Sequence, residues 1–329
     1  MRVSVPAVRV VGPPCVIHTV YSPFQMIRVL GTVFAALMGL AFGSFLNVCL
    51  SRWPAGESVV RPRSHCRNCD HTLAWWENVP LLSWLALRGR CRTCGTWISW
   101  RYSLVELGMG ALWAHIASGP YPDVPGDFIP LPLLLYVFAV RILTMILIWL
   151  LVALAVLDAE QLWLPDFLTL PGAAIGLAYA ILDPFLLLKL DQLTGLPLTE
   201  GTDTTSFGLW TPGAVRFAAV IAAAALILLI RWIYKLLRHR EGLGLGDAKL
   251  MAMLAAWLGL PGALLSFVIG VVLGSLAGIV LLVRGAKSTT QETWATARLP
   301  LGTFLCIGGI ITSLWGQPII AAYLRWAGF

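Results

Sequence analysis

The chain has 329 residues, of which 58% are hydrophobic and only 12% are charged, and its formal net charge is +7. A soluble domain carries about 25% charged residues, so this chain cannot cover a water-facing surface, which excludes a soluble enzyme, a nucleic-acid-binding domain and a disordered chain. A membrane β-barrel is excluded too, because its strands would be short and alternate in polarity, whereas the apolar runs here are long and continuous.

Eight apolar segments predict an all-α polytopic membrane protein, because helices satisfy their own backbone hydrogen bonds inside a bilayer. The segments cover residues 26–50, 102–118, 132–157, 167–188, 213–234, 248–260, 262–283 and 301–326. Pro261 and Gly262 divide the sixth segment from the seventh. Residues 1–25 form an N-terminal extension that lacks the apolar core of a signal peptide. After the first membrane helix at 26–50 we expect an insert at 51–101 and a membrane helical bundle at 102–329.

The charges between the segments predict the topology. The connections 51–101, 231–247 and 284–300 are rich in Lys and Arg. The connections 119–131 and 189–212 carry mostly acidic residues. Because basic loops stay in the cytoplasm, eight spans with both chain ends outside fit this alternation. The positive net charge therefore reflects membrane orientation, and no nucleic-acid partner is expected.

Two C-x-x-C pairs lie in the insert between the first two expected helices. Cys66 and Cys69 form the first pair, and Cys91 and Cys94 form the second, which begins 22 positions after the first ends. Four thiolates spaced in this way can complete a tetrahedral Zn²⁺ shell that has no open position. A closed shell is structural, and its binding energy would fold an insert too small to have much core. We therefore expect a small cytoplasmic zinc-binding insert.

The neighbours of the cysteines leave alternatives open. A turn former follows each pair, Asp70 after the first and Gly95 after the second, as zinc knuckles require. His65 and His71 flank the first pair and are either further ligands or bystanders. A redox-active dithiol pair and unligated thiols are the alternatives to a metal site.

Two aspartates are expected at helix ends on one face of the membrane. Asp158 ends the third helix, and Asp247 opens the sixth after three glycines, Gly242, Gly244 and Gly246. A carboxylate at a membrane helix end is either a snorkelling anchor or functional. The glycines favour function, because bare backbone lets an extended peptide approach closely. Two carboxylates in a partly dry site cannot both ionise, so one keeps a proton while the other polarises water, which is aspartic protease chemistry.

Longer motifs surround these residues. They are Gly-Ser-Phe-Leu-Asn-Val at 43–48, Arg-Trp-Pro at 52–54, the two cysteine pairs, Asn-Val-Pro at 78–80, Ser-Trp-Arg-Tyr-Ser-Leu-Val-Glu at 99–106, Leu-Pro-Asp-Phe-Leu-Thr-Leu-Pro at 164–171 and Glu-Gly-Leu-Gly-Leu-Gly-Asp-Ala-Lys-Leu at 241–250. In this order, over residues 39–267, they resemble the bacterial type IV prepilin peptidases. These are the GxGD-type leader peptidases of pili and of type II secretion.

The resemblance implies a multi-pass enzyme of the bacterial inner membrane with its active site at the cytoplasmic face. It would remove the short basic leader of type IV prepilins or type II secretion pseudopilins. Asp158 and Asp247 are similar to the two catalytic aspartates of the family. Asp166, in the neighbouring Pro-Asp step, resembles a supporting residue, or it is the N-cap of the following helix. Lys249 either biases the charge of the aspartates or snorkels.

The same resemblance implies a second activity, N-methylation of the new amino terminus with S-adenosylmethionine. The stretch around Gly43, Asn47 and Arg52 and the zinc insert are associated with that activity in the family. The implied cofactors are therefore a structural zinc ion and, for methyl transfer, S-adenosylmethionine. The implied partners are prepilin or pseudopilin substrates held in the lipid bilayer.

Three other functions fit some of these residues. Another GxGD intramembrane aspartyl protease, of the presenilin or preflagellin type, would use the same aspartates, but the cysteine insert argues against it. A proton- or cation-coupled transporter would use Asp158 and Asp247 as a relay. A zinc-anchored scaffold would have no chemistry at all. Cleavage of a prepilin-like peptide that is lost in both Asp→Asn variants separates a peptidase from a transporter or a scaffold.

Overall fold

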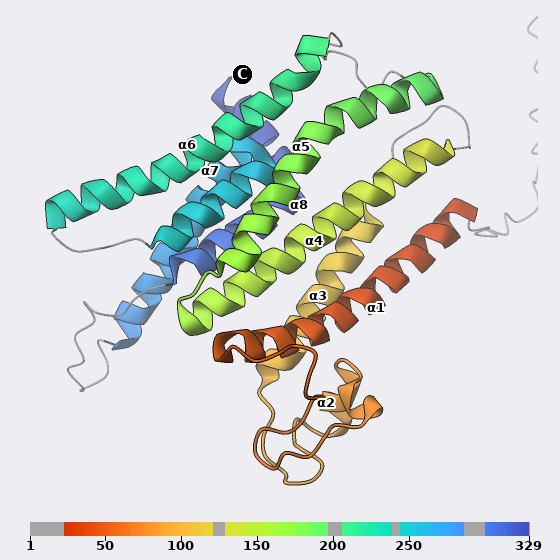
Figure 1. The fold of residues 1–329 in the computed structure, drawn as a ribbon, viewed down its shortest axis with the longest axis vertical. Coiled ribbons are helices and arrows are strands. Elements are labelled where there is room, and N and C mark those ends of the chain that lie inside the picture. Colours follow the sequence, from red (N-terminus) through yellow and green to blue (C-terminus); the bar gives the residue numbers. More distant parts are fainter. Residues whose placement is uncertain (1–22, 121–128, 197–205, 239–243, 286–299, 329) are drawn as a thin grey trace, which may run out of the picture.

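The computed structural model describes residues 23–120, 129–196, 206–238, 244–285 and 300–328. The long helices are α1 (Pro23–Arg52), α3 (Trp100–Ser118), α4 (Leu131–Gln161), α5 (Asp166–Thr194), α6 (Ser206–Arg238), α7 (Leu245–Gly285) and α8 (Leu301–Ala327). Between α1 and α3 lie the 3-10 helices η1 (Trp53–Ala55) and η2 (Trp75–Asn78) and the short α2 (Leu82–Ala86). Figure 1 shows the long helices in one slanted bundle, with these short elements grouped below the C-terminal end of α1.

The predicted all-helical membrane architecture is confirmed. Six of the described helices, α1 and α4 to α8, are long and apolar enough to cross a membrane. The eight expected segments map onto seven long helices, because the sixth and seventh form α7, a single element with a break inside it. The second expected segment is α3, which is not among the six. It has 19 residues and carries Arg101, Glu106 and His115, and these polar side chains lower its hydropathy.

α7 breaks near the proline that predicts a division there. Gly259 has a non-helical backbone, with φ 73° and ψ 177°, two positions before Pro261. A proline has no N–H to donate to the carbonyl four residues earlier, which here belongs to Trp257. Arg216 of α6 takes the place of that donor, with Nη1 3.1 Å from the Trp257 carbonyl oxygen. A side chain of α6 thus satisfies the carbonyl group that the break leaves free.

The two halves of α7 fold back, and both pack against α8. At Gly308 of α8 the space for a Cβ is filled by Ser266, and at the adjacent Gly309 it is filled by Leu254. Ser266 and Leu254 would lie about 18 Å apart on a straight helix. Both ends of α7 therefore lie at the same end of the bundle as the start of α8 (Figure 1).

The core of the bundle is shared by α4, α7 and α8. Its fully buried side chains include Leu151, Leu154, Leu157, Leu250, Met253, Leu254 and Leu305. Because lipid is as apolar as leucine, close packing rather than escape from water holds such helices together. Leu157 directly precedes Asp158, and Ala248 of the same core directly follows Asp247. Packing therefore fixes both helix ends that carry the aspartates.

α1 and α3 cross closely because glycines face the partner helix. A Cβ on Gly39 would lie 2.6 Å from the carbonyl oxygen of Met109, and one on Gly43 would lie 2.8 Å from the Cα of Glu106. No larger residue fits at either position without moving a backbone. Gly43 thus serves the packing of the helix pair from which the insert projects.

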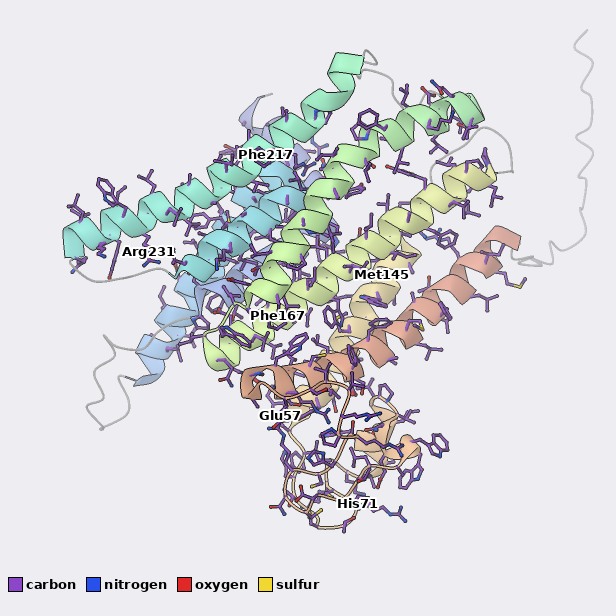
Figure 2. The ribbon with its side chains drawn as sticks, viewed as in Figure 1. Glu57, His71, Met145, Phe167, Phe217 and Arg231 are labelled. Atoms are coloured by element: carbon purple, nitrogen blue, oxygen red, sulfur yellow. The ribbon has the colours of Figure 1, made fainter. Side chains whose placement is uncertain are left out.

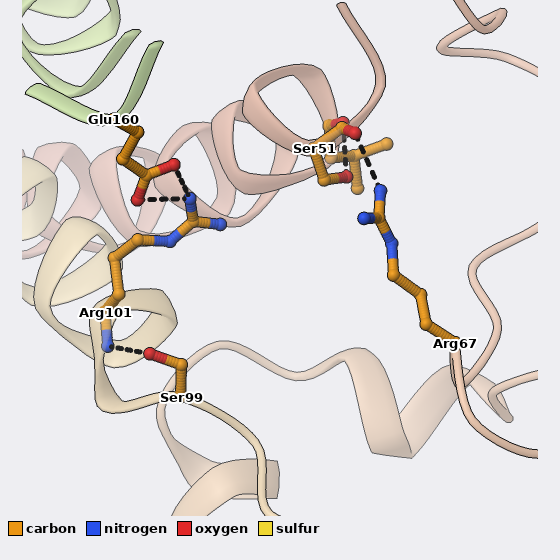
Figure 3. Close-up of polar contacts among 6 residues, drawn as sticks. Ser51, Arg67, Ser99, Arg101 and Glu160 are labelled. Atoms are coloured by element: carbon orange, nitrogen blue, oxygen red, sulfur yellow. Dashed lines mark hydrogen bonds and ion pairs between the residues drawn. The ribbon is translucent and has the colours of Figure 1, made fainter. Parts of the chain in front are cut away.

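Among the contacts that join the insert and α3 to the rest of the bundle, two lie near the connection from α4 to α5. Arg101, at the start of α3, donates from Nη1 to both carboxylate oxygens of Glu160 at the end of α4, at 2.8 and 2.6 Å (Figure 3). Trp53 of η1 meets the ring of Phe167 edge-on, with ring centroids 5.3 Å apart. Phe167 lies at the end of α5 nearest the insert, whose Glu57 and His71 are labelled in Figure 2. The insert therefore adjoins the bundle end where α4 stops and α5 begins.

Candidate active site and metal centre

Asp158 lies in the last turn of α4, which stops where Leu162 adopts a left-handed backbone with φ 52°. Its side chain is buried, and its Oδ2 accepts hydrogen bonds from the backbone N–H of Thr303, at 2.6 Å, and from the Thr303 hydroxyl, at 3.1 Å. A Cβ on Gly302 would lie only 2.9 Å from the same oxygen. The first turn of α8 thus encloses the carboxylate, and only glycine fits at position 302.

Asp247 lies in the first turn of α7 and is also buried. Its Oδ2 accepts a hydrogen bond from the backbone N–H of Gly244 at 3.1 Å. This is one half of a capping box, in which a third-position side chain reaches back to the residue before the helix. The positive end of the helix dipole also favours a carboxylate here. The local sequence therefore stabilises a buried acidic group that has no cationic partner within the described part of the chain.

The structure brings the two aspartates together at one end of the bundle. Leu164, in the connection from α4 to α5, occupies the space beside Gly302 and also the space beside Gly246. The ends of α4, α7 and α8 therefore meet around the pair of carboxylates. Such a pair can share one proton and polarise a water molecule.

The glycines before Asp247 serve two different purposes. Gly246 is a packing position, since a Cβ there would lie 3.0 Å from the Cβ of Leu164. At Gly244 a Cβ would meet only ordinary contacts with the described residues, the nearest being Asp247 Oδ2 at 3.5 Å. Room for a close approach of peptide backbone is thus found at Gly244 and not at Gly246. Gly242 lies outside the described residues.

Asp166 and Lys249 form an ion pair beside the aspartates. Lys249 Nζ lies 2.5 Å from Asp166 Oδ1, and the two side chains are 39% and 57% exposed. The N-cap of α5 is Pro165, and Asp166 is the first residue of the helix, so the interpretation of Asp166 as an N-cap is wrong. The pair joins the start of α5 to the first turn of α7 and lies toward solvent.

The four cysteines of the insert come together as predicted. All four Sγ atoms lie within 4.8 Å of one another, with Cys66 and Cys94 at 3.8 Å and Cys69 and Cys91 at 4.0 Å. A tetrahedron of Zn–S bonds of about 2.3 Å has S···S edges of about 3.8 Å. The cluster can therefore hold one zinc ion with little rearrangement.

The two knuckles share one backbone design. Asp70 N–H donates to the Cys66 carbonyl and Gly95 N–H to the Cys91 carbonyl, both at 2.9 Å. Asp70 and Gly95 both have left-handed backbones, with φ 54° and 70°, which explains a turn former at each position. Each cysteine pair is thus preorganised by its own tight turn.

Neither flanking histidine belongs to the cysteine cluster. His65 contacts the Arg63 carbonyl through Nδ1, and His71 contacts Glu77 through Nε2 at 3.4 Å. The N–H of Ala74 donates to the Glu77 carboxylate at 2.7 Å. This hydrogen bond, aided by His71, lowers the pKa of Glu77. Of the two roles left open for the histidines, the structure favours the one outside the metal shell.

A cavity of about 790 Å³ lies between the insert and the ends of α1 and α3. Asn47 and Arg52 line it, and Gly43 does not. Asn47 donates from Nδ2 to the Tyr102 carbonyl at 2.9 Å. Arg52 is buried and donates to the carbonyls of Ser58 and Pro62, at 2.8 and 2.7 Å. Arg52 thus holds the first loop of the insert against α1.

Two family models match in succession along the chain. The bacterial peptidase A24 N-terminal domain matches residues 37–119, which contain the C-terminal half of α1, the cysteine insert and α3. The type IV leader peptidase family matches residues 145–279, which contain both aspartates. The chain belongs to the type IV leader peptidase family. The family resemblance drawn from the sequence motifs is thereby confirmed.

The curated relatives match over most of their length. A protein from Pseudomonas putida named prepilin leader peptidase/N-methyltransferase is 32% identical over 317 residues, which cover 90% of this chain and 94% of the relative. Relatives with the same name from Stutzerimonas stutzeri and Burkholderia pseudomallei strain 1026b are 33% and 35% identical, over 89% and 87% of this chain and 93% and 85% of their own lengths. No solved structure matches the chain.

The sequence did not indicate two parts of these sites. Thr303 and Gly302 hold Asp158 from a position 145 residues away, and an apolar helix start carries no local signal of such a contact. Glu106 was visible only as the last residue of a motif, although it is buried and lines the cavity beside Asn47.

Proposed function

We propose that this chain is a membrane aspartic endopeptidase that removes the leader of type IV prepilins or type II secretion pseudopilins. The main support for the proposal is that Asp158 and Asp247 lie at helix ends of the same bundle end as two buried carboxylates, each of which accepts a hydrogen bond from a backbone N–H. The family and the names of the relatives support the substrate class. A transporter would also use paired aspartates, but it has no such support.

In this mechanism the two carboxylates share one proton. One removes a proton from a water molecule, which attacks the carbonyl carbon of the scissile bond, while the other donates its proton to the carbonyl oxygen. Thr303 fixes one carboxylate from α8, and Gly244 fixes the other from the start of α7. Preorganised donors of this kind hold each carboxylate in place before the substrate arrives.

We infer that this end of the bundle faces the cytoplasm. The basic connections predict that orientation, and the cysteine insert, which needs reduced thiols for zinc, adjoins the end of α4, whose last turn contains Asp158. The Arg101–Glu160 contact joins the two regions. Substrate would therefore be cut where its leader leaves the cytoplasmic side of the bilayer.

Methyl transfer is proposed as the second activity, supported by the relatives' names and by the cavity beside Asn47 and Arg52. S-adenosylmethionine would supply the methyl group, and the new N-terminus of the processed substrate would accept it. The four cysteines would hold a structural zinc ion, because their shell leaves no open position for chemistry.

The test of the peptidase assignment uses three variants, Asp158→Asn, Asp247→Asn and Asp191→Asn, purified as full chains in lipid nanodiscs. We expect the first two to abolish removal of the leader from a prepilin, seen as a gel shift, while membrane insertion is retained. Asp191 lies at the far end of α5 and serves as the matched control, with cleavage retained. Near-normal cleavage by Asp158→Asn or by Asp247→Asn would refute the proposal.

A further inference from the structure

Glu106 of α3 is a buried carboxylate on the wall of the cavity between α1, α3 and the insert. Its Oε2 accepts a hydrogen bond from the backbone N–H of Leu81 at 2.8 Å. The side chains of Ser44 and Asn47 lie next to the carboxylate. Among the described residues no Lys, Arg or His forms an ion pair with Glu106. Arg52, in the same cavity wall, is committed to two backbone carbonyls.

Burying a carboxylate costs free energy because water is removed, and the neutral donors around Glu106 offset that cost only in part, since none of them carries a positive charge. Three further acceptors in the cavity-lining residues also lack donors, and one of them, Glu77 Oε1, lies in η2 of the insert. Asn47 Oδ1 and Ser103 Oγ are buried without a hydrogen-bond partner in the described structure, and Asn47 is only 2% exposed. Buried polar atoms are normally paired. A cation that carries several N–H donors would complement Glu106, Asn47 and Ser103 together.

A primary ammonium fits this description, since it has one positive charge and three donors. We propose that Glu106, with Asn47 and Ser103, binds the α-amino group of the processed peptide and accepts its proton before methylation. This assignment rests on the methyl-transfer activity proposed above. It makes Glu106 a catalytic residue of the second reaction, apart from the aspartates of the first.

The step balances without any further reagent. The ammonium of the new N-terminus gives one proton to the Glu106 carboxylate, which frees the nitrogen lone pair. That pair attacks the methyl carbon of the sulfonium donor, so a C–N bond forms as the S–CH₃ bond breaks. The electrons of the broken bond go to sulfur, which becomes a neutral thioether.

The position of the cavity suits a peptide that has just been cut. Asp158 lies one helical turn from the end of α4, where Glu160 binds Arg101 at the start of α3 (Figure 3). Glu106 lies five positions further along α3. The amine is thus released at the same end of the bundle as its acceptor. The methyl donor carries a primary ammonium of its own, so the test must separate the two sources.

The test compares wild type with Glu106→Gln, using full chains in nanodiscs, radiolabelled S-adenosylmethionine and a synthetic leaderless prepilin peptide. Gln keeps the shape and an acceptor for the Leu81 N–H but removes the charge. We expect methylation to fall roughly 100-fold, as on loss of a general base, while leader removal and zinc content stay unchanged. Glu106→Asp should restore part of the rate, and Asp191→Asn, which alters a carboxylate of α5 outside the cavity lining, should behave as wild type.

A second measurement identifies which amine is bound. Wild type should bind the leaderless peptide more tightly than its N-acetylated form, and Glu106→Gln should lose that preference. Weakened binding of S-adenosylmethionine with an unchanged peptide preference would overturn the assignment in favour of the donor's own amine. Methylation at the wild-type rate by Glu106→Gln would overturn it outright. If the wild-type protein cleaves the leader but never methylates the product, the proposed methyl-transfer activity itself is refuted.

Discussion

Replacing Gly302 by alanine tests whether the start of α8 sets the position of Asp158. The new Cβ would lie 2.9 Å from Asp158 Oδ2 and 2.9 Å from Leu164 Cδ1, whereas ordinary contacts begin at 3.4 Å. The carboxylate must therefore retreat by about 0.5 Å. Because Thr303 is the next residue, the same retreat stretches its 2.6 Å hydrogen bond to Asp158.

The expected loss follows from the size of that shift. A catalytic group misplaced by about 1 Å costs on the order of 100-fold in rate, so half of that shift costs on the order of tenfold. The loss should appear in kcat for leader cleavage, with KM little changed, because the leader does not need Asp158 in order to dock. The assay is a time course of prepilin processing in nanodiscs at saturating substrate.

Gly316→Ala provides the matched control on the same helix. There the new Cβ would also meet a heavy atom at 2.9 Å, but that atom is the methyl group of Thr312, away from the aspartates. An equal loss in both variants would mean that α8 packing as a whole is responsible. A wild-type kcat in Gly302→Ala would refute the idea that this contact fixes the carboxylate.

Two further predictions concern the metal and the outer ion pair. Purified protein should contain about one zinc per chain, as a closed four-thiolate site requires. The double variant Cys66→Ser, Cys69→Ser should release the zinc and destabilise the insert, while leader cleavage persists. Metal analysis and cleavage assays check this prediction, and a zinc-free preparation with a folded insert would contradict it. Lys249→Met should change cleavage little, because an exposed pair such as Lys249–Asp166 contributes about 1 kcal/mol or less; loss of all activity in that variant would show that Lys249 acts on the aspartates directly.

The regular parts of this fold were predictable because each depends on local sequence. Apolar runs of membrane length specify helices, and the paired cysteines with Asp70 and Gly95 specify two knuckles. The break in α7 was predicted from Pro261 and Gly262, but the residue that leaves the helical region is Gly259. Proline disfavours helix in the residues before it, and a glycine there accepts the positive φ without strain.

The remaining features depend on contacts between distant segments. Gly246 packs against Leu164. The sequence alone could not distinguish this packing role from a role in letting substrate approach, because each role needs a residue without a side chain. The pairing of Asp166 with Lys249 joins residues 83 positions apart. The apolar first turn of α8 gave no sign that Thr303 would meet Asp158. Such contacts depend on how helices dock, and a local pattern does not encode docking.

The fold-back of α7 also bears on the bilayer around the enzyme. From Leu245 to Leu258 the helix has fourteen residues, which rise about 21 Å, and this is shorter than the hydrocarbon core of about 30 Å. Before its break α7 cannot cross a membrane of ordinary thickness. Either lipids thin around the start of α7, or Asp247 lies below the level of the surrounding headgroups. In both cases we expect the rate of leader cleavage to depend on the acyl-chain length of the host lipid.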